Sequence, residues 1–251
     1  MSMLNWFRAV MVLALAPFLT IFCSLLVLIG RGLLRIPVVK IQAAPRFWAK
    51  VISAASGVKV RVEGLERLDR TRPYIFVANH QSQFDIFVLD GYFDIDFRWL
   101  AKKELFRIPF FGWAMLLAGS IPVDRSHGRQ ALKSLDAAAQ RIAAGASVII
   151  FPEGTRSQDG KLQPFKAGGM LLAIKSGVEL VPVAIMGTRE ILPKGRLLAR
   201  PGRVLIRVGQ PVASRDFTTR QKQELAELMH ARVAALLADA PSIKASKATR
   251  C

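Results

Sequence analysis

The strongest constraint on the fold is an uncharged stretch near the N-terminus. Residues 9–29 contain no Asp, Glu, Lys or Arg, a run of 21 residues. At a rise of about 1.5 Å per residue, a helix of this length reaches across a hydrocarbon core of about 30 Å. Because so apolar a segment is poorly solvated by water, we expect residues 1–56 to form a membrane-anchoring helical segment.

Basic residues flank this apolar stretch unequally. Arg8 precedes it, whereas five basic residues follow it with no acid between the first and the last of them: Arg31, Arg35, Lys40, Arg46 and Lys50. Positively charged flanks stay on the cytoplasmic side of a membrane. The asymmetry therefore predicts that the rest of the chain is cytoplasmic.

Three arrangements of the N-terminal segment remain open. It forms a single spanning helix, a helical hairpin within one leaflet, or a cleaved signal peptide, which the basic flank disfavours. Pro17 lies near the middle of the run, where a proline kinks a helix. Residues 45–56 interleave apolar and basic side chains. This pattern fits either a second helix at the membrane interface or an amphipathic helix packed on the domain.

Short apolar runs alternate with helical patterns beyond Gly57. This alternation predicts an α/β domain over residues 57–240, with a mixed central sheet flanked by helices. We expect strands at 58–62, 74–78, 97–101, 121–123, 147–151, 179–186 and 204–208. We expect helices at 85–93, 129–144, 167–176 and 219–238, and a helical or irregular stretch at 104–119. Residues 241–251 are polar and basic, and we expect a disordered tail.

The charge balance narrows the class of partner. Lys and Arg number 36 against 18 Asp and Glu, which gives a formal net charge of +18. Such a field attracts an anionic membrane, a phosphorylated substrate or nucleic acid. The apolar N-terminus favours the membrane, and no nucleic-acid-binding motif accompanies the charge. Cys23 and Cys251 lack the spacing of metal ligands or of a disulfide framework, so we expect neither a metal nor a cofactor.

His80 is the histidine best placed for chemistry. It follows the predicted strand at 74–78 and precedes Asp85 by five residues. In one continuous helix these side chains would point roughly 140° apart and could not pair. If the helix begins near Phe84 instead, Asp85 lies in its first turn and can accept the ring N–H of His80, which leaves the other nitrogen free as a base. A turn histidine beside an acid at a helix N-terminus is the alternative.

A second polar cluster, Phe151-Pro152-Glu153-Gly154-Thr155-Arg156-Ser157, follows a predicted buried strand. Ligands usually bind where the strands of an α/β sheet end. The guanidinium of Arg156 suits a phosphate, and Gly154 lets the backbone approach a ligand closely. Glu153 is placed to orient Arg156 or a substrate hydroxyl. Taken alone, the cluster also fits a polar turn with a surface arginine.

Together, the two clusters resemble the motifs of the glycerophospholipid acyltransferase family. Asn79-His80-x-x-x-x-Asp85 matches the first principal motif, and the 151–157 cluster matches the second. Weaker blocks at 119–125 and 181–185 and a basic segment at 102–105 appear in the expected order, although Pro122 replaces a more usual aromatic or aliphatic residue. The resemblance is closest to the bacterial 1-acyl-sn-glycerol-3-phosphate acyltransferases.

The resemblance implies direct acyl transfer without a covalent acyl-enzyme. His80 would take the proton of a lysolipid hydroxyl, held by Asp85, and the alkoxide would attack an acyl thioester of acyl carrier protein or coenzyme A. The implied acceptor is the sn-2 hydroxyl of 1-acyl-glycerol-3-phosphate, which yields phosphatidic acid at the cell inner membrane. The residues expected to contact substrate are Lys102, Arg125, Glu153, Gly154, Thr155 and Arg156.

Rival functions remain on sequence grounds. A hydrolase would need an activated nucleophile, and the chain has no G-x-S-x-G elbow. A non-enzymatic basic binding protein is suggested by residues 194–207, which contain no acid. Within the family, the acceptor could be another lysophospholipid or a lyso-aminolipid such as lyso-ornithine lipid.

Overall fold

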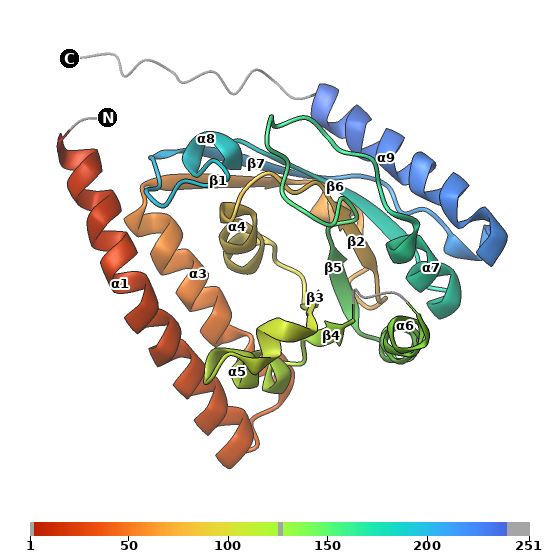
Figure 1. Cartoon of the computed structure of the whole chain (residues 1–251), viewed down its shortest axis with the longest axis horizontal. Helices are drawn as coiled ribbons and strands as arrows, with labels where there is room; N and C mark the ends of the chain where they lie inside the picture. Colours follow the sequence, from red (N-terminus) through yellow and green to blue (C-terminus); the bar gives the residue numbers. More distant parts are fainter. Residues whose placement is uncertain (1–2, 125–127, 240–251) are drawn as a thin grey trace.

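The computed structural model describes residues 3–124 and 128–239, which form a seven-stranded sheet with helices on both faces (Figure 1). The strands are β1 (Val58–Glu63), β2 (Ile75–Ala78), β3 (Phe97–Lys102), β4 (Ile121–Val123), β5 (Ser147–Ile150), β6 (Leu180–Met186) and β7 (Gly202–Val208). The α-helices are α1 (Met3–Val27), α2 (Val38–Ile41), α3 (Ala43–Ala55), α4 (Phe84–Tyr92), α5 (Phe111–Leu117), α6 (Arg129–Ala143), α7 (Ala167–Ser176), α8 (Thr188–Ile191) and α9 (Lys222–Ala238).

The sheet is mixed, as the sequence predicted. Its strand order is β1-β7-β6-β2-β5-β3-β4. β2 pairs in parallel with both β5 and β6, and β3 pairs in parallel with β5 and β4. β7 is antiparallel to β6, and β1 is parallel to β7. The two strands β1 and β7, at one side of the sheet, therefore run antiparallel to the other five. The carboxyl ends of those five strands all lie at the same end of the sheet.

Side chains of the central strands alternate between two cores, because successive residues of a strand face opposite sides. Phe76 and Ala78 of β2 join the core beneath α3 and α4. Ile75 and Val77 join the core beneath α6, α7 and α9. Every residue of β2, β5 and β6 is buried, which explains why all of them but Ser147 are apolar.

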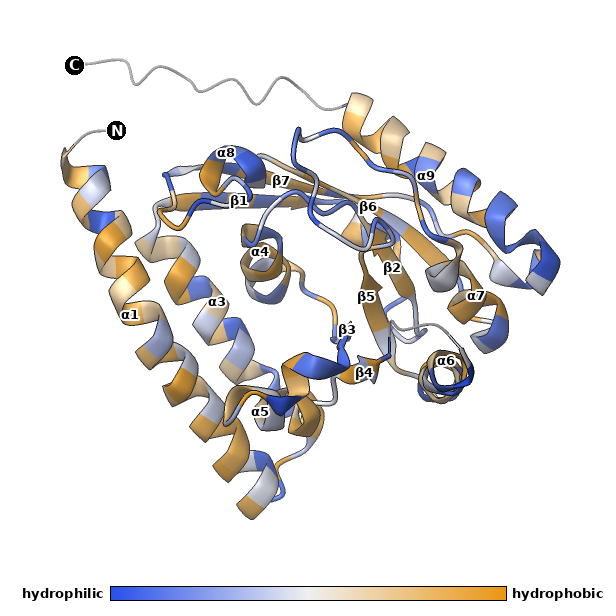
Figure 2. Ribbon diagram, in the orientation of Figure 1, coloured by the Kyte–Doolittle hydropathy of each residue, from blue (hydrophilic) through white to orange (hydrophobic). Residues whose placement is uncertain are grey.

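The N-terminal helix lies along one side of the domain (Figure 1). It passes through Pro17 without ending and continues as a π-helical turn, Leu28–Leu33. The combined helix is long and apolar enough to cross a membrane. Its inner face packs on the core through Val12, Ala16 and Leu19, and apolar side chains also cover its outer face (Figure 2).

Helix α3 corresponds to the amphipathic segment predicted at 45–56. It packs between α1 and α4. Trp48 donates its indole N–H to Thr20 of α1 at 2.9 Å, and its ring lies 4.9 Å from that of Phe87 in α4. Of the two alternatives for this segment, the structure therefore has the helix packed on the domain, although Phe47 remains half exposed.

Some elements differ from the sequence prediction. The stretch at 104–119 divides into a 3-10 helix, Lys103–Arg107, and α5, with Phe110 between them at φ 60°. The last helix begins as a 3-10 turn, Thr219–Gln221, before α9. The short helices α2 and α8 were not predicted. Arg125 and the tail at 241–251 lie outside the described residues.

Candidate active site

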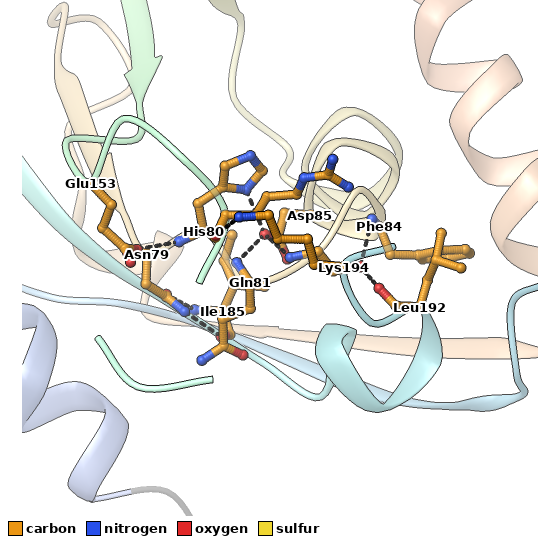
Figure 3. Close-up of polar contacts among 11 residues, drawn as sticks. Asn79, His80, Gln81, Phe84, Asp85, Glu153, Ile185, Leu192 and Lys194 are labelled. Atoms are coloured by element: carbon orange, nitrogen blue, oxygen red, sulfur yellow. Dashed lines mark hydrogen bonds and ion pairs between the residues drawn. The ribbon is translucent and has the colours of Figure 1, made fainter. Parts of the chain in front are cut away.

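The site forms where β2 and β5 end side by side. The two strands are parallel, with Val77 opposite Ile150, so the segments that follow them leave the sheet at the same edge. One segment carries His80 and Asp85, and the other is the 151–157 cluster. The fold therefore brings together the two motifs that are far apart in sequence (Figure 3).

Asn79 fixes the point at which the chain leaves β2. Its side-chain amide donates to the carbonyl of Ile185 at 2.9 Å, and its side-chain oxygen accepts the N–H of the same residue at 2.7 Å. The side chain thus continues the pairing with β6 while the main chain turns away. The motif contains this residue, but no local sequence pattern indicates that its partner is β6.

His80 and Asp85 pair across this turn. Helix α4 begins at Phe84, so Asp85 lies in its first turn, as the sequence predicted. Nδ1 of His80 is 2.8 Å from Oδ2 of Asp85. The same oxygen accepts the main-chain N–H groups of Gln81 at 2.8 Å and Ser82 at 2.9 Å. An ionised carboxylate only accepts hydrogen bonds, so Nδ1 carries the proton and Nε2 presents a lone pair.

Asp85 and His80 differ in their exposure to solvent. Asp85 is fully buried, whereas the His80 side chain is 17% exposed. One face of the imidazole stacks on Phe151, with ring centroids 4.0 Å apart and planes inclined by 13°. The base is therefore held at one edge and covered on one face, and remains partly open to a substrate.

Glu153 is held between the two motif segments. Its Oε1 accepts the main-chain N–H of His80 at 2.6 Å, and its Oε2 accepts that of Gln163 at 3.1 Å. Burial raises the pKa of this carboxyl group, and the two N–H donors oppose the rise. The sequence prediction had Glu153 orienting Arg156 or a substrate hydroxyl. In the structure its carboxylate instead fixes the main chain of His80.

The rest of the 151–157 segment presents polar groups next to the base. The N–H of Ser157 donates to the His80 carbonyl at 2.8 Å. Gly154 has φ 77°, and a Cβ there would lie 2.9 Å from Nζ of Lys166. Lys194 donates to the Arg156 carbonyl at 2.9 Å, so the loop after α8 also supports this segment. Arg156 is half-buried, and Gly154 and Thr155 are exposed.

The remaining predicted substrate contacts come from the neighbouring strand. Lys102 is the last residue of β3. This strand is parallel to β5, so both strands end on the same side of the sheet as His80. Its ammonium group is exposed and lies 3.6 Å from Glu104. The adjacent Lys103 pairs with Asp124 at 2.6 Å. Arg125 falls in the gap between the described ranges, so its position relative to Lys102 is not part of this geometry.

Comparison with known proteins agrees with this arrangement. The sequence model of the Acyltransferase family matches residues 59–186, a segment that contains both motifs. The chain belongs to this acyltransferase family. A 1-acyl-sn-glycerol-3-phosphate acyltransferase from Pseudomonas aeruginosa is 32% identical over 79% of this chain and 77% of the relative.

Further members of the acyltransferase family are similar. A chloroplastic 1-acyl-sn-glycerol-3-phosphate acyltransferase from Arabidopsis thaliana is 38% identical over 66% of this chain and 47% of the relative. The chain spans about half the length of such plant and algal relatives. The crystal structure of the 1-acyl-sn-glycerophosphate acyltransferase from Thermotoga maritima has a TM-score of 0.80 and 28% identity, covering 95% of this chain and 97% of that one.

No group of three or more His, Cys, Asp or Glu side chains in residues 3–124 and 128–239 is arranged to hold a metal ion. The polar groups around His80 are the carboxylates of Asp85 and Glu153, main-chain N–H groups and basic side chains. Such a set is suited to proton transfer and to binding an anion.

Proposed function

We propose that this chain transfers an acyl group from an acyl thioester to the sn-2 hydroxyl of 1-acyl-glycerol-3-phosphate, forming phosphatidic acid. The observation that carries the proposal is the 2.8 Å pairing of His80 with a buried Asp85 beside the 151–157 segment. The names of the relatives from Pseudomonas aeruginosa and Thermotoga maritima support the choice of acceptor.

The proposed chemistry needs one base and no covalent intermediate. Nε2 of His80 accepts the proton of the acceptor hydroxyl while its oxygen attacks the thioester carbonyl. The tetrahedral intermediate collapses, the C–S bond breaks, and the imidazolium returns the proton to the departing thiolate. Asp85 stabilises the imidazolium. General-base assistance of this kind contributes roughly 10²–10⁴-fold to the rate.

Basic groups around the base would hold the acceptor phosphate. Arg156 and Lys102 lie at the same edge of the sheet as His80, and we assign Arg125 to the same task from its motif. The exposed main chain at Gly154 and Thr155 is suited to contact the donor or the oxyanion. Acyl carrier protein and coenzyme A are both acidic, so either donor suits a chain of net charge +18.

We further propose that α1 anchors the chain in the inner membrane, with the α/β domain at 57–240 on the cytoplasmic side. α1 packs against α3 and α5, and α3 in turn packs on α4. Arg46 of α3 pairs with Asp94 at 3.0 Å. Threading α1 across a bilayer would draw these charged neighbours toward hydrocarbon, which costs about 3 kcal/mol per charged side chain. This packing favours α1 lying in one leaflet.

The test is acyl transfer by purified protein with lysophosphatidate and each thioester donor. We expect His80→Ala to abolish transfer while the protein stays folded, and Arg156→Ala to raise the KM for lysophosphatidate more than it lowers kcat. Full activity of His80→Ala would overturn the assignment of the base. Release of free fatty acid without acceptor would identify a hydrolase, and faster use of a lyso-aminolipid would replace the acceptor.

A further inference from the structure

A stack of aromatic rings extends from the candidate base into the domain. The His80 ring lies on Phe151, with centroids 4.0 Å apart. Phe151 in turn stacks on Trp99 of β3, with centroids 6.0 Å apart and planes inclined by 24°. Trp99 also meets Phe97 edge to face at 5.3 Å. Phe151 therefore neighbours both the imidazole and the indole.

The far end of this stack is fixed by a carboxylate. Nε1 of Trp99 donates a hydrogen bond to Oδ1 of Asp90 at 3.0 Å. Asp90 lies on α4, the helix whose first turn supplies Asp85. One helix therefore holds the imidazole twice, directly at its edge through Asp85, and at its face through Asp90, Trp99 and Phe151.

We propose that Asp90 and Trp99 are positioning residues that hold Phe151 against the His80 ring and thereby fix the direction of Nε2. The inference rests on the proposed function, because it takes His80 as the base. It goes beyond that function in assigning a task to two residues that lie outside the acyltransferase motifs quoted above.

The His80 ring needs a second contact because its hydrogen bond to Asp85 leaves one motion free. The bond from Nδ1 to Asp85 fixes one edge of the ring, but the ring can still tilt about the line through that contact. A flat neighbour at 4.0 Å opposes the tilt. The electron-rich face of Phe151 also favours the imidazolium that forms during proton transfer. Misplacing a catalytic group by about 1 Å costs up to about a hundredfold in rate.

Burying the ionisable carboxyl group of Asp90 costs free energy, which a neutral hydrogen-bond acceptor would avoid. Its carboxyl group is half-buried, and burial raises its pKa to about 7, against the opposing effects of the Trp99 hydrogen bond and the charge of Arg46. An asparagine would offer the indole the same acceptor without a charge. The position thus provides a matched pair of variants that separates the hydrogen bond from packing.

The experiment compares Asp90→Ala, Asp90→Asn, Trp99→Phe and the double variant Asp90→Ala/Trp99→Phe in the full-length protein. Trp99→Phe keeps an aromatic ring at this position and removes the N–H donor together with part of the ring area. We expect Asp90→Ala and Trp99→Phe each to lower kcat about tenfold with KM unchanged. Asp90→Asn should restore most of the rate. The double variant should be no slower than either single one, because both remove the same support.

A spectroscopic measurement follows the imidazole itself. With histidine labelled in its ring, we expect Asp90→Ala and Trp99→Phe to shift the His80 resonances, because the ring moves relative to Phe151. The resonances of His230, whose ring contacts Phe165, serve as the internal control and should not move. Asp136→Asn is the matched control variant, because Asp136 lies on α6, has a half-exposed side chain and pairs with Lys175 outside the stack.

Two results would overturn the inference. One is a wild-type kcat with unshifted His80 resonances in Asp90→Ala and Trp99→Phe. The other is additive losses of rate, or losses that Asp90→Asn fails to restore, with the His80 resonances in place. Neither result would touch the proposed function, which depends on the inactivity of His80→Ala. If His80→Ala were active, the proposed function would fail first.

Discussion

The main-chain N–H of His80 donates a 2.6 Å hydrogen bond to Oε1 of Glu153. The carbonyl of the same residue accepts the N–H of Ser157 at 2.8 Å. The 151–157 segment therefore holds the backbone of the candidate base from both sides. These hydrogen bonds join the two motifs of the family directly in this chain. A substitution in the 151–157 segment should therefore change the position of His80.

Glu153→Gln tests this connection. Each oxygen of Glu153 faces a main-chain N–H, and a glutamine must turn its own NH₂ group toward one of them. An unsatisfied buried donor costs about 1–3 kcal/mol. We expect a loss of unfolding free energy in that range, measured by denaturant titration, together with a lower kcat. Glu104→Gln, at an exposed ion pair, is the control, and equal stability of the two variants would contradict the clamp.

Asp85→Asn should lower kcat by about 10²–10⁴-fold with little change in KM. The replacement can still accept the N–H groups of Gln81 and Ser82, so the turn should remain folded. It cannot balance the charge of an imidazolium. Steady-state kinetics with saturating donor would measure the loss, with Asp96→Asn as a control at an exposed carboxylate. A kcat within a few-fold of wild type would separate Asp85 from the chemistry.

Asn79→Asp should destabilise the turn after β2. The aspartate can accept the N–H of Ile185, but its second oxygen then faces the Ile185 carbonyl, where the amide now donates. We expect a loss of about 1–3 kcal/mol in unfolding free energy. Thermal or denaturant unfolding would detect it, and unchanged stability would show that the side chain does not act as an extension of the strand.

Asp90 should make stability depend on pH. Its folded pKa of about 7 lies above its ordinary value of 3.8. Between these two pKa values the folded chain keeps a proton that the unfolded chain releases. The free energy of unfolding therefore decreases as pH rises toward the folded pKa. Asp90→Asn does not titrate, so its stability relative to wild type should increase between about pH 4 and about pH 7 and then level off. A difference that stays constant, or one that decreases, would contradict the assignment.

The outer face of α1 should bind lipid. Phe18 is 72% exposed and Phe22 is 52% exposed, and neither packs on the core. We expect Phe18→Asp/Phe22→Asp to reduce flotation with anionic vesicles while leaving the unfolding midpoint unchanged. Leu132→Asp, at a similarly exposed leucine on α6, should float as wild type does. Equal flotation of all three proteins would place the membrane contact elsewhere.

The sequence predicted the elements with strong local patterns. β2 and β5 were found within one residue of their predicted bounds, and the bounds of α7 were predicted without error, because fully buried strands and a glycine-ended helix leave clear signals. The pairing of His80 with Asp85 also followed from spacing, once a turn was allowed before the helix.

Long-range contacts left no such signal. Nothing local indicates that Asn79 bonds to β6, that Glu153 faces a main-chain N–H of the other motif, or that Trp99 stacks on Phe151. These contacts join residues on or just after different strands, and they depend on a sheet order that the sequence did not supply. The reversal of β7 against β6 is likewise a property of the connection through α8 rather than of either strand.

If α1 anchors the chain in a leaflet as proposed, the contact between Trp48 and Thr20 helps to fix the distance of His80 from the lipid. The indole of Trp48 on α3 bonds to α1 and also lies 4.9 Å from the ring of Phe87, which is on α4, the helix that carries Asp85. If α1 lies in one leaflet, the folded structure fixes the distance between the His80 ring and the lipid acyl chains. A lysolipid would react only at the glycerol position that reaches this distance from the acyl chains.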